Sequence, residues 1–434
     1  SSHSVVSKLP VMAPSRARRK RIDQHRKAED PVQTQIREIY NALDRYDFSA
    51  LQELAFRKHG FCNAELRRRV WTSLLGLAPE QAKDTSWRKL LEGIRNDDQT
   101  SRTIQADVQR SVYSWDVHTG IKKAVRNKKR NDLSEVMHAI LLSHPGKLQY
   151  FQGFHDIALV FLEVGSPSQA YYMVNRVALF CLSDQLCWPF ERGLTPLLAM
   201  LFYLLEALDA PVAQAFREAE CTELHFAVSW VLTWFSHSLS RLQQVMRLFD
   251  CLLVSHPAMI LYFCVALILR YRDEVLTTPR EIPDMMCLFQ RIEWDKLDVD
   301  AWAVEAHSLA HRLTPQDLVA QLPSVVRRAL PWTSPTLLSF PHPWVRGQAD
   351  RYRIQHVSAG EISAMAPVYR NNQGSSALAR SRFNPLVLFW CMMSSGFHGF
   401  LALCLRTTLL PLKAVTTCFC VLVLGGRRAG RLTD

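Results

Sequence analysis

Apolar residues in this chain recur at steps of three and four positions, which is the repeat of an amphipathic α-helix. The pattern is clearest between Glu223 and Val275. Three apolar segments follow one another there: Leu224, Val228, Leu232, Phe235 and Leu239; then Leu242, Val245, Met246, Phe249 and Leu253; then the nearly all-apolar run from Met259 to Leu269. No convincing period-two strand occurs before residue 320, so the sequence predicts an all-α fold.

Helix signals and breaks set the extent of this fold. The helical pattern runs from residue 31 to residue 322, which predicts one domain of a dozen or more short helices. His144-Pro145-Gly146 is a strong stop signal, and Ser255-His256-Pro257 separates two of the predicted helices. Another helical stripe consists of Ile104, Val108, Val112 and Trp115.

The ends of the chain differ from this domain. Residues 1–30 are polar and basic, and we expect them to be disordered. Residues 323–382 are rich in proline and read as a linker. Leu386–Leu405 then holds 20 residues without a formal charge, the length that a bilayer core requires. We therefore predict a membrane-anchoring transmembrane tail at 383–424, and a single span and a hairpin both stay open.

Charge is unevenly distributed along the sequence. There are 52 Lys and Arg residues against 40 Asp and Glu residues, a formal net charge of +12, and Ser15–Lys27 and Lys122–Arg130 carry much of the excess. We interpret both runs as solvated and partly disordered. A nucleic-acid binder is the alternative, but no known motif and no interleaved aromatic residues accompany the runs, so we expect no nucleic-acid partner.

Several site types lack their sequence signals. The 11 cysteines show no repeating spacing and no CxxC pair, and HExxH is absent, so we expect reduced thiols and no metal site. There is also no GxxxxGK[ST] and no GxGxxG, so the chain is not expected to bind nucleotide itself.

Three short patterns within the helical region suggest a functional interpretation. Arg67 and Trp71 are four positions apart, as expected for a guanidinium packed on an indole. Asp107 and Arg110 are three positions apart, so they form either an ordinary intrahelical pair or a positioned basic group. Tyr150–Gly153 places an amide and a glycine among aromatic residues. It is either a loop between helices or a mount for Gln152.

Together these patterns, R-x-x-x-W, I-x-x-D-x-x-R and Y-x-Q-G in this order, resemble the TBC domain of Rab GTPase-activating proteins over roughly residues 60–275. The resemblance implies that Arg110 is an arginine finger and Gln152 a glutamine finger, both supplied in trans to a GTP-bound Rab. It implies supporting roles for Asp107, Tyr150 and Gly153, and structural roles for Arg67 and Trp71. No cofactor of its own is expected, because GTP and magnesium arrive on the partner.

Within that family, the combination of YFQGFHDI with an apolar C-terminal tail is similar to a branch anchored in the endoplasmic reticulum membrane. This implies a helical domain facing the cytosol that regulates ER-to-Golgi traffic. The alternative is a non-catalytic scaffold that holds a Rab at the membrane without accelerating hydrolysis.

Overall fold

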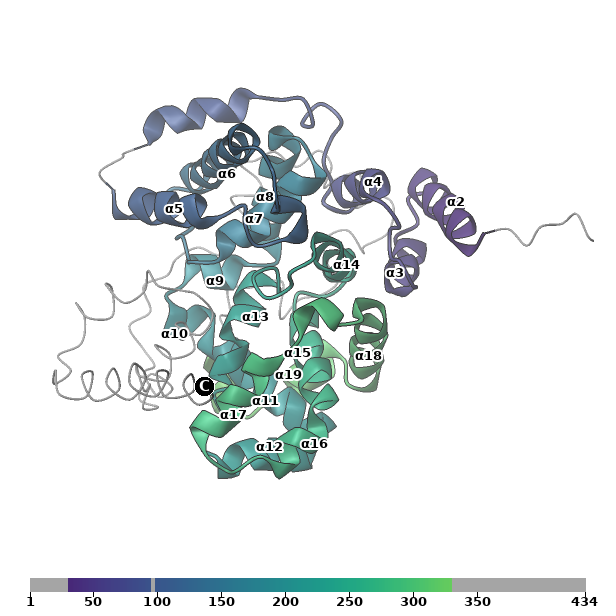
Figure 1. Ribbon diagram of the computed structural model, residues 1–434, viewed down its shortest axis with the longest axis vertical. Coiled ribbons are helices and arrows are strands. Elements are labelled where there is room, and N and C mark those ends of the chain that lie inside the picture. The colour runs from purple at the N-terminus through teal and green to yellow at the C-terminus, as the bar shows by residue number, and fades with distance from the viewer. Residues whose placement is uncertain (1–29, 95–97, 330–434) are drawn as a thin grey trace, which may run out of the picture.

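The computed structural model describes residues 30–94 and 98–329, and every regular element in these ranges is a helix (Figure 1). The α-helices are α2 (Pro31–Asp44), α3 (Phe48–Phe56), α4 (Ala64–Leu74), α5 (Gln99–Arg110), α6 (Lys123–Ser143), α7 (Phe154–Val164), α8 (Pro167–Phe180), α9 (Ser183–Cys187), α10 (Phe190–Gly193), α11 (Thr195–Leu208), α12 (Ala210–Glu218), α13 (Val228–Thr233), α14 (Leu242–Leu253), α15 (Met259–Arg270), α16 (Arg272–Thr277), α17 (Ile282–Leu288), α18 (Val299–Arg312), α19 (Pro315–Gln321) and α20 (Ser324–Ala329). Between them lie the 3₁₀ helices η1 (Ser86–Gly93), η2 (Asp116–His118), η3 (His225–Ala227), η4 (Phe289–Arg291) and η5 (Trp294–Lys296). The all-α prediction is confirmed for the described residues.

Local sequence accounts for many of the helix ends. Asn63 caps α4 by accepting a hydrogen bond from the Leu66 N–H at 2.9 Å. Ser166 and Gln169 form a reciprocal capping box at the start of α8. Helix α6 ends at Ser143, directly before the predicted stop, and the break at Ser255-His256-Pro257 separates α14 from α15.

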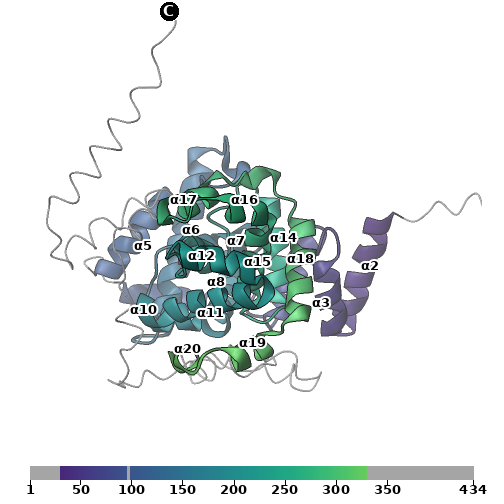
Figure 2. The same ribbon diagram turned by 90° about the horizontal axis from the view of Figure 1, so that it is seen from below.

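Two helices form the centre of the core. Helix α15 is buried at every position from Met259 to Ile268, and most of α7 is buried as well, as expected for helices that are apolar all round. Helices α5 to α8 gather at one end of the long axis, and α12, α16 and α17 lie at the other (Figure 1). Figure 2 shows α2, α3 and α18 on one flank and α5 on the opposite flank.

The predicted stripe from Leu224 to Leu239 is not one helix. It consists of η3 and the six-residue α13, and the chain then turns at Trp234 and Phe235, which have φ of 50° and 58°. Both aromatic side chains are buried, so burial in the core outweighs the cost of left-handed backbone.

The predicted stripe of Ile104, Val108, Val112 and Trp115 also extends beyond its helix. Helix α5 ends at Arg110, and Val112, which has φ of 66°, and Trp115 lie past its end, although both are buried. Periodicity alone therefore identifies which residues are buried but not where the helix stops.

Residues 1–29 of the predicted N-terminal segment 1–30 lie outside the described residues, as do the predicted tail 383–424 and most of the expected linker. The short helix α20 occupies residues 324–329, at the start of that linker. Among the described helices, none has both the length and the hydropathy needed to cross a bilayer.

Candidate functional site

The last turn of α5 presents an exposed arginine on a buried carboxylate. The Arg110 guanidinium donates to Asp107 Oδ1, and the two side chains are 47% and 1% exposed. A buried carboxylate is costly unless donors satisfy it, and Asp107 in turn holds the guanidinium of Arg110 at one terminal nitrogen. The other guanidinium nitrogens can face a partner molecule.

The loop before α7 supplies the second donor to Asp107. The hydroxyl of Tyr150 donates to Asp107 Oδ2 at 2.6 Å. Burial, together with the negative charge of Asp107, raises the pKa of Tyr150 well above its ordinary value, so this hydroxyl stays protonated and keeps donating. Tyr150 thereby ties the loop that carries Gln152 to the helix that carries Arg110.

Gln152 and Gly153 occupy the turn into α7. Gly153 has φ of 110°, a left-handed conformation that a glycine adopts without strain, and it directly precedes the first helical residue. The Phe154 N–H closes this turn on the carbonyl of Phe151 at 3.2 Å. Within the described part of the chain, the half-buried Gln152 amide forms no side-chain hydrogen bond, so its donor and acceptor are both available to a partner.

A histidine and carboxylate network continues from Tyr150 into the interior. His155 Nδ1 lies 3.0 Å from the Tyr150 hydroxyl, and His155 Nε2 lies 3.3 Å from Asp156 Oδ1. Asp156 Oδ2 lies 3.0 Å from Nδ1 of His237, in the turn that follows α13. Burial would raise the pKa of Asp156, but the two histidines lower it below its ordinary value.

Gly153 occupies the capping position of α7, and the Asp156 carboxylate points to histidines instead. His155 and His237 therefore form part of the polar support of the site.

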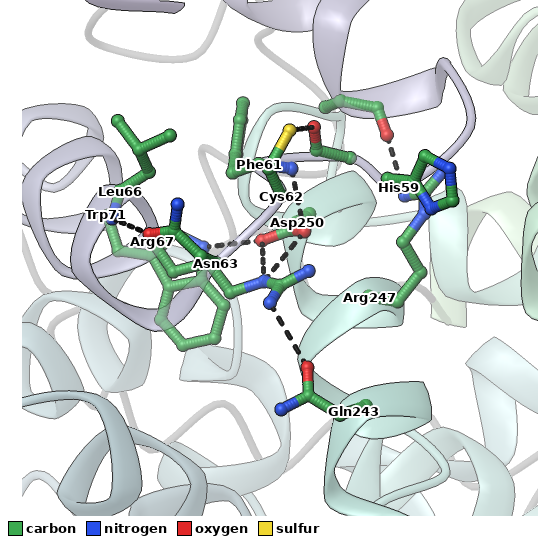
Figure 3. A network of polar contacts seen from close by, with 12 residues as sticks. His59, Phe61, Cys62, Asn63, Leu66, Arg67, Trp71, Gln243, Arg247 and Asp250 are labelled. Carbon is green, nitrogen blue, oxygen red and sulfur yellow. Dashed lines mark hydrogen bonds and ion pairs between the residues drawn. The ribbon is translucent and has the colours of Figure 1, made fainter. Parts of the chain in front are cut away.

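Arg67 and Trp71 meet through a third residue instead of stacking on each other. Both donate to the fully buried carboxylate of Asp250 on α14: Arg67 Nε at 3.0 Å and the Trp71 indole N–H at 2.9 Å (Figure 3). The Phe61 N–H donates to the same carboxylate at 3.1 Å. The expected cation–π pair is therefore replaced by a buried ion pair that fixes α4 on α14, and both residues are structural.

The two candidate finger residues come from neighbouring elements with complementary chemistry. A guanidinium can stabilise negative charge on phosphate oxygens, and an amide can both orient a water molecule and donate to an oxygen. Neither group provides a nucleophile or binds a nucleotide by itself. The arrangement suits a reaction whose substrate is carried by a second protein.

Comparison with known families agrees with this geometry. A family model described as the Rab-GTPase-TBC domain matches residues 64–276. Residues 64–276 form a TBC domain. All the site residues named above lie within it, apart from Phe61.

Sequence similarity to curated proteins covers more residues than the family model does. TBC1 domain family member 20 from human and from cattle is 28% identical over 288 residues, which is 66% of this chain and 69% of each relative. The GTPase-activating protein gyp10 of Schizosaccharomyces pombe is 28% identical over 239 residues, covering 55% of this chain and 61% of gyp10.

Solved structures show the same fold. The Ypt/Rab-GAP domain of Gyp1p superposes with a TM-score of 0.54 at 15% identity and covers 65% of this chain and 99% of that domain. The Chlamydomonas flagellar RabGAP TBC domain superposes with a TM-score of 0.51 at 17% identity, covering 69% and 97%.

Proposed function

We propose that this chain is a GTPase-activating protein for a Rab-family GTPase, with Arg110 as its arginine finger and Gln152 as its glutamine finger. The observation that carries the proposal is the Asp107 and Tyr150 link, which joins the two finger-bearing elements inside a TBC domain. The GTP-bound Rab is the substrate and brings its own magnesium ion.

The chemistry assigns a separate task to each finger. Hydrolysis is slow when charge that builds on the phosphate oxygens is poorly stabilised and the attacking water is loosely held. The Arg110 guanidinium stabilises that charge, and an arginine supplied in trans raises the rate by roughly 10³- to 10⁵-fold. The Gln152 amide accepts a hydrogen bond from the water and donates one to the phosphate.

The test is single-turnover GTP hydrolysis by a panel of purified Rabs, with the full-length chain and its Arg110→Ala and Gln152→Ala variants. We expect one or a few Rabs to respond, and each substitution to remove roughly two or more orders of magnitude of the acceleration. If a Rab binds but its GTP hydrolysis is not accelerated, the chain is a non-catalytic scaffold and the finger assignment fails.

We also propose that the apolar segment 383–424 anchors the chain in a membrane of the early secretory pathway, with the TBC domain in the cytosol. The support is its length and its low charge. Cell fractionation with alkaline extraction tests this: the full chain should stay with membranes, and a chain ending at residue 382 should be released. Equal extraction of both would reject the anchor.

A further inference from the structure

Exposed large apolar side chains cluster beside the arginine of the site. In the described part of the chain five such side chains are exposed, and three of them lie within 13 residues just after Arg110. These are Tyr113, Val117 and Val125, at 57%, 44% and 46% exposure. Single exposed apolar residues need no explanation, but a cluster of this kind typically marks a contact surface.

Arg126 and Arg130 of α6 hold the segment that carries Tyr113 and Val117 against the start of α6, where Val125 lies. The Arg126 guanidinium lies 4.2 Å from the centre of the Tyr113 ring and donates to the carbonyls of Val112 and His118, each at 3.2 Å. It thus binds both ends of the segment that runs from the end of α5 through η2. Val125 is the neighbour of Arg126 on α6.

The same surface is tied directly to the end of α5. The Arg130 guanidinium lies 5.0 Å from the centre of the Tyr113 ring and also donates to the carbonyls of Gln109 and Ser111, the two neighbours of Arg110. Carbonyls at a helix C-terminus lack partners within the helix, so these bonds fix the backbone that carries Arg110. Tyr113 is therefore held close to the backbone that carries Arg110.

The backbone between Arg110 and Tyr113 is strained. Val112 is fully buried and has φ of 66°, which is unfavourable for a β-branched residue. Strain of this kind persists only where the surroundings enforce it, and it concentrates at functional sites. Here the buried side chain and the Arg126 bond to the Val112 carbonyl enforce it.

The basic run Lys122–Arg130 is ordered at the start of α6, so our interpretation of it as partly disordered is wrong, whereas its side chains are exposed or half-buried, as expected for a solvated run. Four of its six basic residues have internal partners: Arg126 and Arg130 as above, Lys128 with Asp132 at 3.0 Å, and Lys129 with Glu163 at 2.6 Å. Only Lys122 and Lys123 have no partner among the described residues. Two free lysines around an apolar centre suit a protein surface better than an anionic membrane, which favours larger clusters.

We propose that Tyr113, Val117 and Val125, with Lys122 and Lys123 at the edge, form the surface on which the GTP-bound Rab docks. This inference rests on the proposed function and assigns the partner's position on the TBC domain. The complementary Rab surface is apolar at its centre and carries carboxylates at its rim. The docking surface holds the Rab, and Arg110 and Gln152 act on its nucleotide.

The test separates docking from chemistry by steady-state kinetics with the full-length chain and the Rab that responds most strongly. We expect Tyr113→Ala and Val125→Asp each to raise the KM for that Rab by roughly tenfold, with kcat within about twofold of the parent. Val304→Asp is the matched control, since Val304 is a helical valine with 57% exposure on α18, on the flank opposite α5 (Figures 1 and 2). It should leave both constants unchanged.

Each other outcome overturns a distinct statement. Unchanged KM in both variants, with the parent still active, rejects the docking surface and leaves the proposed function standing. A parent that accelerates no Rab rejects both. If the variants keep their KM but lose cosedimentation with phosphatidylserine vesicles, the surface binds lipid and the docking proposal is wrong. Thermal unfolding of each variant at the parent's midpoint excludes a folding defect as the cause of a raised KM.

Discussion

At the scale of single residues, Asp107 links the helix that carries Arg110 to the loop that carries Gln152, the two proposed finger residues. One of its carboxylate oxygens accepts from Arg110 and the other accepts from Tyr150. The guanidinium is thus held at one nitrogen before it meets a partner, and less conformational freedom is lost when its other nitrogens bind a phosphate. Preorganisation of this kind contributes to kcat more than to binding.

Tyr150→Phe tests this support. The substitution keeps the ring but leaves Asp107 Oδ2 without its 2.6 Å donor, and a hydrogen bond to a charged group contributes about 1.5–3 kcal/mol. We expect kcat for the GTP hydrolysis that this chain stimulates on the Rab to fall roughly tenfold or more, while KM changes little. Tyr171→Phe is the matched control, since its hydroxyl contacts Ser143 instead. Equal kcat values for the two variants would show that Asp107 does not depend on Tyr150.

The sequence indicates the chemistry of the site better than its supporting contacts. Asp107, Arg110 and Tyr150 can be selected because their spacing within short motifs is informative. The contact of Asp156 with His237 joins residues 81 positions apart, and no local pattern predicts it. Asp250 does carry a signal, since a carboxylate within an apolar helical face must be paired when buried, but its partners cannot be deduced.

At the scale of elements, the Asp250 carboxylate connects the start of the domain to α14. It accepts from Arg67 and Trp71 on α4 and from the backbone of Phe61 (Figure 3). The loop can approach closely enough only because residue 60 is a glycine, with φ of 50°. A Cβ atom there would lie 2.6 Å from Asp250 Oδ2.

Gly60→Ala should therefore lower the free energy of unfolding by more than the left-handed backbone strain of an alanine at this position would cause. Displacing Asp250 leaves the buried Arg67 poorly paired, which costs on the order of 3–5 kcal/mol. Gly120→Ala is the control, because Gly120 has φ of 73° and a Cβ atom there would meet nothing within 4 Å, and left-handed strain alone costs about 1–2 kcal/mol. Urea unfolding followed by circular dichroism measures both, and equal losses would contradict the close approach to Asp250 as the cause.

Element boundaries are predictable where local signals fix them. The stop before His144 and the break at His256-Pro257 are predicted correctly, since both depend on nearby residues. The turn at Trp234 and Phe235 is not predicted, because neither residue favours left-handed backbone and tertiary burial selects it.

At the scale of the whole molecule, buried neutral histidines make stability depend on pH. Burial lowers the pKa of His256 from 6.5 to about 4, and it also lowers the pKa of His144. The unfolded chain binds more protons than the folded chain between these values, so stability is present above pH 6.5 and is lost as the pH falls towards 4.

We expect His256 alone to contribute on the order of 3 kcal/mol of that loss. The unfolding free energy, measured by urea titration between pH 7 and pH 4, should fall less steeply in a His256→Asn variant. That amide does not titrate and still offers an acceptor to the Ala258 N–H, which donates to His256 Nδ1 at 3.0 Å. Identical slopes for the parent and the variant would show that burial of His256 does not control this pH dependence.

In the proposed mechanism, one chain supplies both the arginine and the glutamine. The decisive measurement is single-turnover GTP hydrolysis by a responding Rab whose own water-orienting glutamine is replaced by alanine. We expect the full-length chain to accelerate this Rab nearly as much as the unmodified one, and Gln152→Ala to abolish the effect. Acceleration of the unmodified Rab alone would contradict the mechanism, because the Rab and not Gln152 would then orient the water.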